Sequence, residues 1–371
     1  MIRFFKVNDP YRLLVILAFL LAVRTVFILL DGPFVKLQLE QDMIGAFVNG
    51  GGLIVEDLMV TNAGPLYVYF YGLITYLSPE SLYISAALSA LFVMVQAFLL
   101  NTILIRLAAF NENTYLPAFI YAVLMSATPE FMTLSPEMVS ITFALIGLNF
   151  MLTHLKYRGT EENILSTGFA FGLAALFAKP AFLYIAFILL IYVLYSSTLN
   201  RRYFLASFGF LLPMIFVWLY FFWSDSGADF LAAYFGQMIN VGSREIIPKV
   251  SLFILVALPL FLTLISAAQN FTGVGMTNNQ IRIQRSMLWL GLFGILFYLI
   301  SANSSFNELI WLMPTAAYFI SMLLNAMEKK WVAEMTLQLL LWGGLYIAMV
   351  PLIDESLSLI DLSGLKIAIS S

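Results

Sequence analysis

The sequence predicts an all-α, polytopic membrane protein, and three observations support this prediction. Hydrophobic residues make up 62% of the 371 residues, whereas charged residues make up 11%. Typical soluble domains are about 25% charged. The mean hydropathy is +0.94, and apolar runs of about 20 residues, the length that crosses a hydrocarbon core, recur from end to end. We therefore expect one transmembrane domain, residues 1–371.

Apolar runs suited to spanning a membrane lie at 11–30, 82–105, 114–128, 138–155, 165–178, 180–196, 204–223, 251–269, 286–301, 309–326 and 333–352. A shorter run, "PLYVYFYGLITYL" at 65–77, is ambiguous. Lysine and arginine favour cytoplasmic loops, and this bias can settle whether 65–77 crosses the bilayer.

If residues 65–77 do not cross, 12 of the 18 basic residues are cytoplasmic. These are Arg3, Lys6, Arg12, Arg106, Lys156, Arg158, Arg201, Arg202, Arg282, Arg285, Lys329 and Lys330. If the run did cross, the bias would reverse. We therefore predict about eleven transmembrane helices, a cytoplasmic N-terminus and an external C-terminus, with 65–77 lying along the outer face.

The acidic residues sort to the opposite side. In this topology 15 of the 21 are external, including Asp31, Asp42 and Glu137. The working face is therefore predicted to be external. The chain has no cysteine and one histidine, which excludes thiolate metal sites and argues against a zinc site. It has no basic stripe, so nucleic acid is not an expected partner. The N-terminus lacks a small-residue cleavage site, so the first run is expected to be a retained helix.

The first helix contains an arginine, and short motifs follow it in a recognisable order. Arg24 lies within the first apolar run, and Asp31, Glu40 and Asp42 come directly after that run. An arginine within a membrane span usually faces the bundle interior and pairs with an acid or a phosphate. Snorkelling of Arg24 to the outer surface is the alternative.

Further stretches continue this order. They are "NGGG" at 49–52, "NAGPLYVYFYGL" at 62–73, "TPEFMTLSPEMVSITFALIGLNFMLTHL" at 128–155, "GFAFGLAALFAKPAFLYIAFILLIYVL" at 168–194 and "ELIWLMPTAAYFISMLL" at 308–324. Together the motifs resemble the GT-C superfamily of membrane glycosyltransferases. They are most similar to the branch of protein mannosyltransferases and the aminoarabinose transferase of lipid A.

The resemblance implies a GT-C-like module over residues 1–200, with juxtamembrane helices in the first external loop. Additional transmembrane helices would follow at 201–352 and a short external tail at 353–371. It implies a multi-pass protein of the bacterial inner membrane. It also implies transfer of a sugar from a polyprenyl-phosphate donor to an acceptor on the external, periplasmic face. The family has metal-dependent and metal-independent members, which leaves a divalent ion, Mg²⁺ or Mn²⁺, open as a cofactor.

Such a transfer needs a carboxylate to take a proton from the acceptor and cations to stabilise the leaving phosphate. By its position after the first helix Asp42 is the predicted base, with Glu40 second, although both acids can instead simply solvate a loop. Glu137 is a candidate for a second catalytic or acceptor-orienting role. Its alternative is stabilisation of a helix N-terminus, because it follows a proline and precedes a helix.

Three cations are candidates for the lipid phosphate: Arg24, Lys179 and Arg244. Lys179 separates two short apolar helices, and the alternative for its Lys-Pro corner is simply to turn the chain. Arg244 can equally be a surface charge. The segment "SDSGADFLAAYFGQM", at 224–238 in the same loop as Arg244, is amphipathic enough to lie on the membrane and cover a cleft.

Two departures from the family pattern keep another function open. The adjacent Asp-Glu pair of the family is replaced by Glu40-Gln41-Asp42, and the late arginine is absent. The alternative is a non-catalytic GT-C-fold subunit that docks a membrane-protein partner in an envelope or secretion complex. A secondary transporter is a weaker alternative, because the sequence shows no evident inverted repeat.

Overall fold

The computed structural model describes residues 1–6, 9–29, 62–77, 82–157, 160–195, 200–236, 250–270, 275–300 and 306–359. Within these residues the chain is helical. The single extended pairing there is an isolated bridge between Ala63 and Ala178.

The helices of the first half are α1 (Ile2–Lys6), α2 (Tyr11–Leu29), α5 (Pro65–Leu77), α6 (Leu82–Arg106), α7 (Leu116–Leu124), η1 (Glu130–Met132), α8 (Pro136–Tyr157) and α9 (Glu161–Phe177). Those of the second half are η2 (Lys179–Leu183), α10 (Tyr184–Tyr195), α11 (Asn200–Trp223), α12 (Gly227–Phe235), α13 (Val250–Gln269), α14 (Asn278–Ile300), η3 (Phe306–Leu312), α15 (Met313–Ala326) and α16 (Lys330–Leu359).

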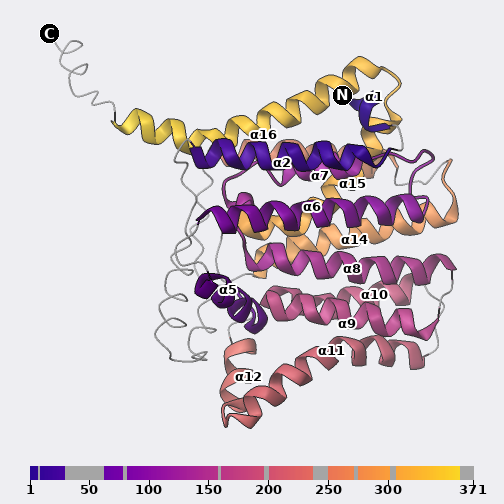
Figure 1. Ribbon diagram of the computed structural model, residues 1–371. Helices are drawn as coiled ribbons and strands as arrows, with labels where there is room; N and C mark the ends of the chain where they lie inside the picture. Colours follow the sequence, from indigo (N-terminus) through magenta and orange to yellow (C-terminus); the bar gives the residue numbers. More distant parts are fainter. Residues whose placement is uncertain are drawn as a thin grey trace.

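The long helices lie roughly side by side and run back and forth between two ends (Figure 1). Helices α5 and α12 lie at one end, which we call the α5 end. The N-terminal helix α1 lies at the other, the α1 end. Two of the basic residues assigned to cytoplasmic loops are Arg106 and Lys156. The Arg106 side chain donates to Asn149 and Thr153, and Lys156 Nζ donates to the Arg106 carbonyl at 3.2 Å. Both lie where α6 and α8 reach the α1 end, so the basic residues gather opposite α5.

The described part contains six helices that are long and apolar enough to cross a membrane: α2, α6, α8, α11, α14 and the η3–α15 segment. By this length and composition the chain is a multi-pass membrane protein, as predicted. Every predicted run coincides with a helix, but several are short, and the total of about eleven spans remains a prediction. Helix α5 has 13 residues, about 20 Å of helix, too short to cross a core of about 30 Å.

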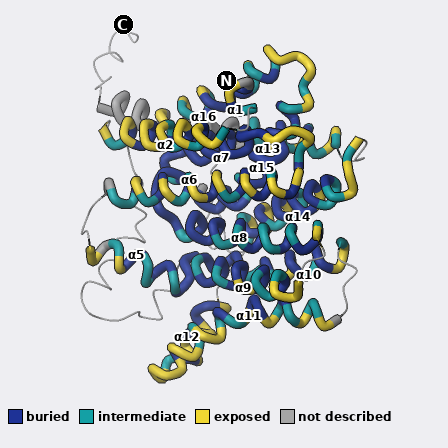
Figure 2. The backbone as a smooth tube through the Cα atoms, turned by 45° about the vertical axis from the view of Figure 1, so that its right-hand side comes forward, coloured by how far each residue is buried: buried dark blue, intermediate teal, exposed yellow. Residues whose placement is uncertain are grey.

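The bundle has a central and a peripheral set of helices. In α8 and in η3–α15, 72% of the 18-residue segment that is apolar enough to cross a membrane is buried inside the bundle. In α2 and α11 the buried share of this segment is 33%. Figure 2 shows the same contrast, with exposed positions concentrated on the outermost helices. Helix α16 continues to Leu359, so the first residues of the predicted tail 353–371 are helical, and the external position of this tail stays a prediction.

Helices α9 and α11 approach closely because glycines face one another's backbones. A Cβ on Gly168 would lie 2.2 Å from the Ala206 carbonyl oxygen, and one on Gly172 would lie 2.2 Å from the Phe210 carbonyl oxygen. This spacing of small residues four apart is the pattern that lets membrane helices pack backbone to backbone. The α9–α11 contact fixes the end of α9, and hence the position of Lys179.

Candidate functional site

Buried polar side chains gather at the α5 end of the bundle. They belong to the segment before α5, to the residues on either side of η1, to η2 and η3 and to the start of α8. Both η1 and α8 contact η3. The buried residues are Asn62, Thr128, Thr133, Ser135, Glu137, Lys179, Asn307 and Glu308. Polar groups buried in a membrane bundle are expensive and usually functional, so this end is the candidate site.

The segment before α5 is held to the corner between α9 and η2. The Gly64 N–H donates to the Phe177 carbonyl at 2.8 Å, and the Lys179 N–H donates to the Asn62 carbonyl at 2.9 Å. A Cβ on Gly64 would lie 2.0 Å from the Leu176 carbonyl oxygen, so only glycine permits this approach. The bridge therefore joins the end of the first long loop to the lysine.

Lys179 is buried at this corner, with 4% of its surface exposed. Its Nζ donates to the Ala233 carbonyl of α12 at 3.4 Å. Pro180 follows in the short 3₁₀-helix η2, which separates α9 from α10 as the sequence predicted. The amphipathic segment predicted to cover a cleft forms α12, and it places its backbone over the lysine.

Asn62 links this lysine corner to a carboxylate from a distant part of the chain. Its Nδ2 donates to Glu308 Oε1 at 3.0 Å, and Glu308 is 1% exposed. We call Asn62, Lys179 and Glu308 the polar cluster. The neighbouring Asn307 is 2% exposed, and its Oδ1 accepts no hydrogen bond from the described residues. Buried amide oxygens are nearly always satisfied, so a ligand hydroxyl is a natural partner for it.

Glu137 lies in the first turn of α8 and is 3% exposed. Its carboxylate interacts with the Ser135 side chain and with its own backbone N–H. These contacts are those of an acid at a helix N-terminus. However, α8 contacts η3, and so does η1. The partly buried Glu130 lies in η1. Glu137 therefore stabilises the start of α8, a helix that also contacts η3.

Arg24 faces the interior and does not snorkel, since it is 2% exposed. Its Nη2 donates to Ser89 Oγ at 3.1 Å and its Nη1 to the Leu20 carbonyl at 3.4 Å. Its Nε has no hydrogen-bond partner among the described residues. The adjacent Val23 packs with Met132 of η1. The hydrogen bonds of Arg24 are thus to α2 and α6, and they do not join it directly to Lys179.

Three predicted site residues, Glu40, Asp42 and Arg244, lie outside the described residues, so their placement stays a prediction. In the described part no three carboxylate or histidine side chains come together as ligands for a metal ion.

Sequence reasoning did not select Asn62 and Glu308. Glu308 had a usable signal, because it stands just before an apolar run, as Glu137 does. No comparable sequence signal identified Asn62.

An apolar pocket of about 250 Å³ lies between the end of α9, η2, α11 and α12. We call it the α11–α12 pocket. Its lining includes Leu176, Phe182, Met214, Trp218 and Tyr234. Leu176 and Phe182 flank Lys179 in sequence, and Tyr234 follows Ala233, whose carbonyl accepts from the lysine. Lys179 is not itself a lining residue, but η2 and α12, which hold it, also bound this pocket.

Comparison with known proteins supports the fold. The chain matches a family described as a family of unknown function, DUF6427, over residues 63–350. No curated protein gives a significant match. Among solved structures, the crystal structure of ArnT from Cupriavidus metallidurans bound to undecaprenyl phosphate is similar, with 16% sequence identity and a TM-score of 0.58. The similarity covers 92% of this chain and 63% of ArnT, so the chain spans less than two thirds of that protein.

Proposed function

Given that the chain belongs to the DUF6427 family and has an ArnT-like fold, we propose that it is a membrane glycosyltransferase of the bacterial inner membrane. It transfers a sugar from a polyprenyl-phosphate donor to an acceptor at the α5 end, which is the external, periplasmic face. The N-terminus is cytoplasmic, and about eleven helices cross the bilayer. The observation that most supports this proposal is Lys179, a buried cation whose backbone N–H donates to the carbonyl of Asn62, the residue whose side chain donates to the buried Glu308 carboxylate.

The donor is amphiphilic, and the two parts of the site match its two parts. The polyprenyl chain lies in the α11–α12 pocket, and Lys179 contacts the phosphate. Arg24, and Arg244 from the loop after α12, add positive charge. Fixed cations stabilise the negative charge that builds on the departing phosphate oxygen.

In the reaction, the acceptor oxygen forms a bond to the anomeric carbon as the bond from that carbon to the phosphate oxygen breaks. Asp42 takes the acceptor proton, with Glu40 as the second choice. Glu137 and Glu308 orient the acceptor, and the Asn307 amide oxygen accepts from one of its hydroxyls. The products are the glycosylated acceptor and the free polyprenyl phosphate. A divalent ion, Mg²⁺ or Mn²⁺, is compatible with this scheme but not required by it.

The reaction is tested by reconstituting the protein in liposomes with radiolabelled undecaprenyl-phosphate mannose or aminoarabinose and a lipid extract as acceptor. Release of free undecaprenyl phosphate and transfer of label are measured. Wild type and Glu112→Gln, an exposed acid at the α1 end, should transfer, whereas Asp42→Asn should not. If wild type and empty liposomes gave the same result with both donors, the transferase proposal would be rejected.

The second candidate is a non-catalytic GT-C-fold subunit with a membrane-protein partner. The Glu40-Gln41-Asp42 departure and the missing late arginine favour it. It predicts that a partner protein copurifies in constant ratio in mild detergent. Replacing the charged side chains of the polar cluster by neutral ones should then leave the amount of copurified partner unchanged.

A further inference from the structure

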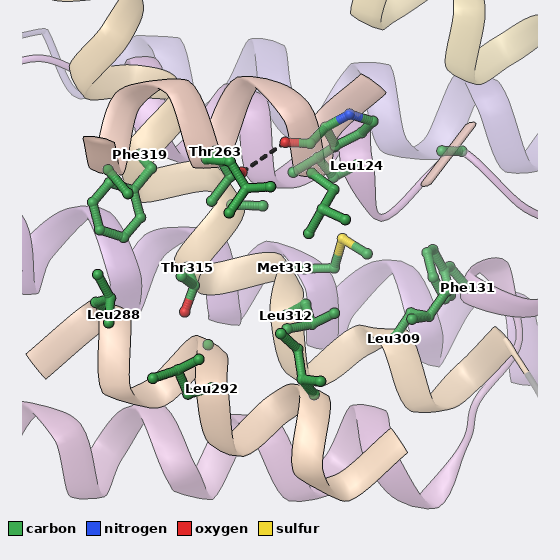
Figure 3. A pocket seen from close by; sticks show the side chains of 18 of the residues that line it. Leu124, Phe131, Thr263, Leu288, Leu292, Leu309, Leu312, Met313, Thr315 and Phe319 are labelled. Atoms are coloured by element: carbon green, nitrogen blue, oxygen red, sulfur yellow. Dashed lines mark hydrogen bonds between the residues drawn. The ribbon is translucent and has the colours of Figure 1, made fainter. Parts of the chain in front are cut away.

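Inside the bundle, threonine hydroxyls that line an apolar pocket are bonded to backbone. The pocket has a volume of about 230 Å³ and is bounded by α7, η3, α13, α14 and α15 (Figure 3). Thr263 Oγ1 donates to the Pro259 carbonyl at 2.7 Å, the dashed line in Figure 3. Thr315 Oγ1 donates to the Met287 carbonyl at 3.1 Å. Such bonding is expected where hydrocarbon replaces water, because an unbonded polar group is costly there.

Helix α16 differs, because it carries an amide on the outside of the bundle. The helix lies at the edge of the bundle (Figure 1) and packs against α7 and α13. It contains the predicted membrane span 333–352. Gln338 is exposed on this helix. Its position about 12 Å along the helix from Lys330 puts the amide within a hydrocarbon core of about 30 Å. A polar side chain at this depth usually faces a neighbouring helix.

Gln338 belongs to a stripe of side chains with the spacing of a coiled-coil seam. Steps of four and three residues alternate along the stripe, which keeps its members on one face of the helix. We call this stripe the α16 seam, and its members are Trp331, Met335, Gln338, Trp342, Leu345 and Met349. Leu345 is partly buried, and the others are exposed. The described part of the bundle therefore leaves this face of α16 uncovered.

The composition of the α16 seam fits a protein-binding face better than a lipid-facing one. Tryptophan concentrates at the two membrane interfaces. Trp331 matches that position, but Trp342 lies about 16 Å farther along the helix, inside the core, and is 66% exposed. Lipid tails offer no acceptor to an indole or amide N–H group. Aromatic residues and methionine are enriched where proteins bind one another.

The amide of Gln338 indicates which protein covers this face. Two copies of one chain enter the membrane in the same orientation, so a two-fold axis along the membrane normal makes their α16 helices parallel. In a parallel pair each seam residue faces its own counterpart. An amide carries both a donor and an acceptor, so Gln338 can bond the Gln338 of a second copy. A charged residue at this position would instead repel its own copy.

From these observations we propose that the protein forms a dimer in the membrane through the α16 seam, with the two Gln338 amides hydrogen-bonded to each other. The two helices pack as a left-handed pair, the common crossing in membranes. A single polar residue in such a seam fixes the register and the number of helices. The inference does not depend on the proposed reaction.

Cysteine cross-linking tests the α16 seam, because the chain has no native cysteine. Met335→Cys, about one turn before Gln338, is purified and reconstituted in liposomes at a high lipid-to-protein ratio. Oxidation with copper phenanthroline should convert most of it to a disulfide-linked dimer. The matched control is Phe98→Cys on α6. Phe98 is also exposed and lies about as far from the basic Arg106 as Gln338 lies from Lys330, and this variant should stay monomeric.

Gln338→Leu removes the amide and keeps a side chain of similar size. It should raise the dissociation constant of the dimer in detergent by about tenfold, measured by energy transfer between donor-labelled and acceptor-labelled copies. It should also lower the yield of the Met335→Cys cross-link. Gln338→Asn, which retains an amide, should lie nearer to wild type. The thermal unfolding midpoint of the monomer should change little, since Gln338 is exposed.

Equal cross-linking of Met335→Cys and Phe98→Cys, or a monomer at every protein concentration, would overturn the inference. An unchanged dissociation constant in Gln338→Leu would overturn the pairing of the amides. In membranes of cells that make the protein, cross-linking of Met335→Cys only to a different protein would assign the α16 seam to that partner and would overturn the dimer as well.

Discussion

At the scale of single residues, the α5 end differs from an ordinary membrane bundle because it buries a lysine and a glutamate, Lys179 and Glu308, and holds both by hydrogen bonds. Lys179 donates to a carbonyl of α12, and its own backbone is bonded to Asn62. Asn62 in turn bonds Glu308. The cluster therefore holds a buried cation and a buried carboxylate in fixed places at the same end of the bundle.

Lys179→Met should weaken binding of undecaprenyl phosphate by about tenfold to a hundredfold. It removes a charge-assisted hydrogen bond of about 1.5–3 kcal/mol. Native mass spectrometry or a fluorescence titration in detergent measures the affinity. Lys156→Met, which removes a cation at the α1 end, should bind as wild type does. An equal loss of affinity in both variants would mean that binding depends on the net charge of the protein and not on the position of Lys179.

Asn62→Ala should lower stability by about 1–3 kcal/mol, because it leaves the buried Glu308 carboxylate without this donor. The thermal unfolding midpoint in detergent measures the effect. Adding Glu308→Leu to Asn62→Ala should recover part of the loss, since both polar partners are then gone. If the double variant lost the sum of the two single effects, the two side chains would not be coupled in the folded protein.

At the scale of elements, helix packing fixes where the lysine corner lies. The α9–α11 contact depends on Gly168 and Gly172, and the bridge onto α9 depends on Gly64. At these glycines two backbones approach so closely that a Cβ atom would not fit between them. The position of Lys179 is therefore set by glycines that never contact a ligand.

Gly172→Ala should destabilise the protein by about 1–3 kcal/mol, because the added Cβ meets the Phe210 carbonyl and α11 must move. Gly343→Ala in α16 provides the matched control. A Cβ there meets nothing within 4 Å, and removing a helical glycine should stabilise by about 0.5–1 kcal/mol. Thermal midpoints that move in the same direction for both variants would contradict this view of the α9–α11 contact.

Local pattern predicts elements well here and long-range pairing poorly. The apolar runs, the Lys-Pro corner at Lys179 and the helix after Ser226 follow from hydropathy and from proline and glycine placement. The Asn62–Glu308 bond joins residues 246 positions apart, and no periodicity signals such a pair. Likewise, the interior position of Arg24 was one of two alternatives, because an arginine one to two turns from a helix end can either snorkel or turn inward.

At the scale of the whole molecule, the bundle has two chemically different ends. Basic side chains gather at the α1 end, and the buried polar cluster lies at the α5 end. This arrangement suits a site that opens at one membrane face. Its orientation in the bilayer rests on the distribution of lysine and arginine and is open to a direct test.

The chain has no cysteine, so single cysteines report topology without background. Tyr76→Cys, at the exposed end of α5, should react with a membrane-impermeant maleimide in intact spheroplasts. Glu112→Cys, at the α1 end, should react only after the membrane is permeabilised. The reverse pattern would place the α5 end in the cytoplasm and would remove the external site.

Binding of a phosphorylated polyprenyl lipid at the α5 end can be seen in a structure determined with added undecaprenyl phosphate. We expect the phosphate within hydrogen-bonding distance of Lys179 Nζ and the chain in the α11–α12 pocket. Phosphate density at the α1 end, or lipid bound only around the outside of the bundle, would contradict the claim.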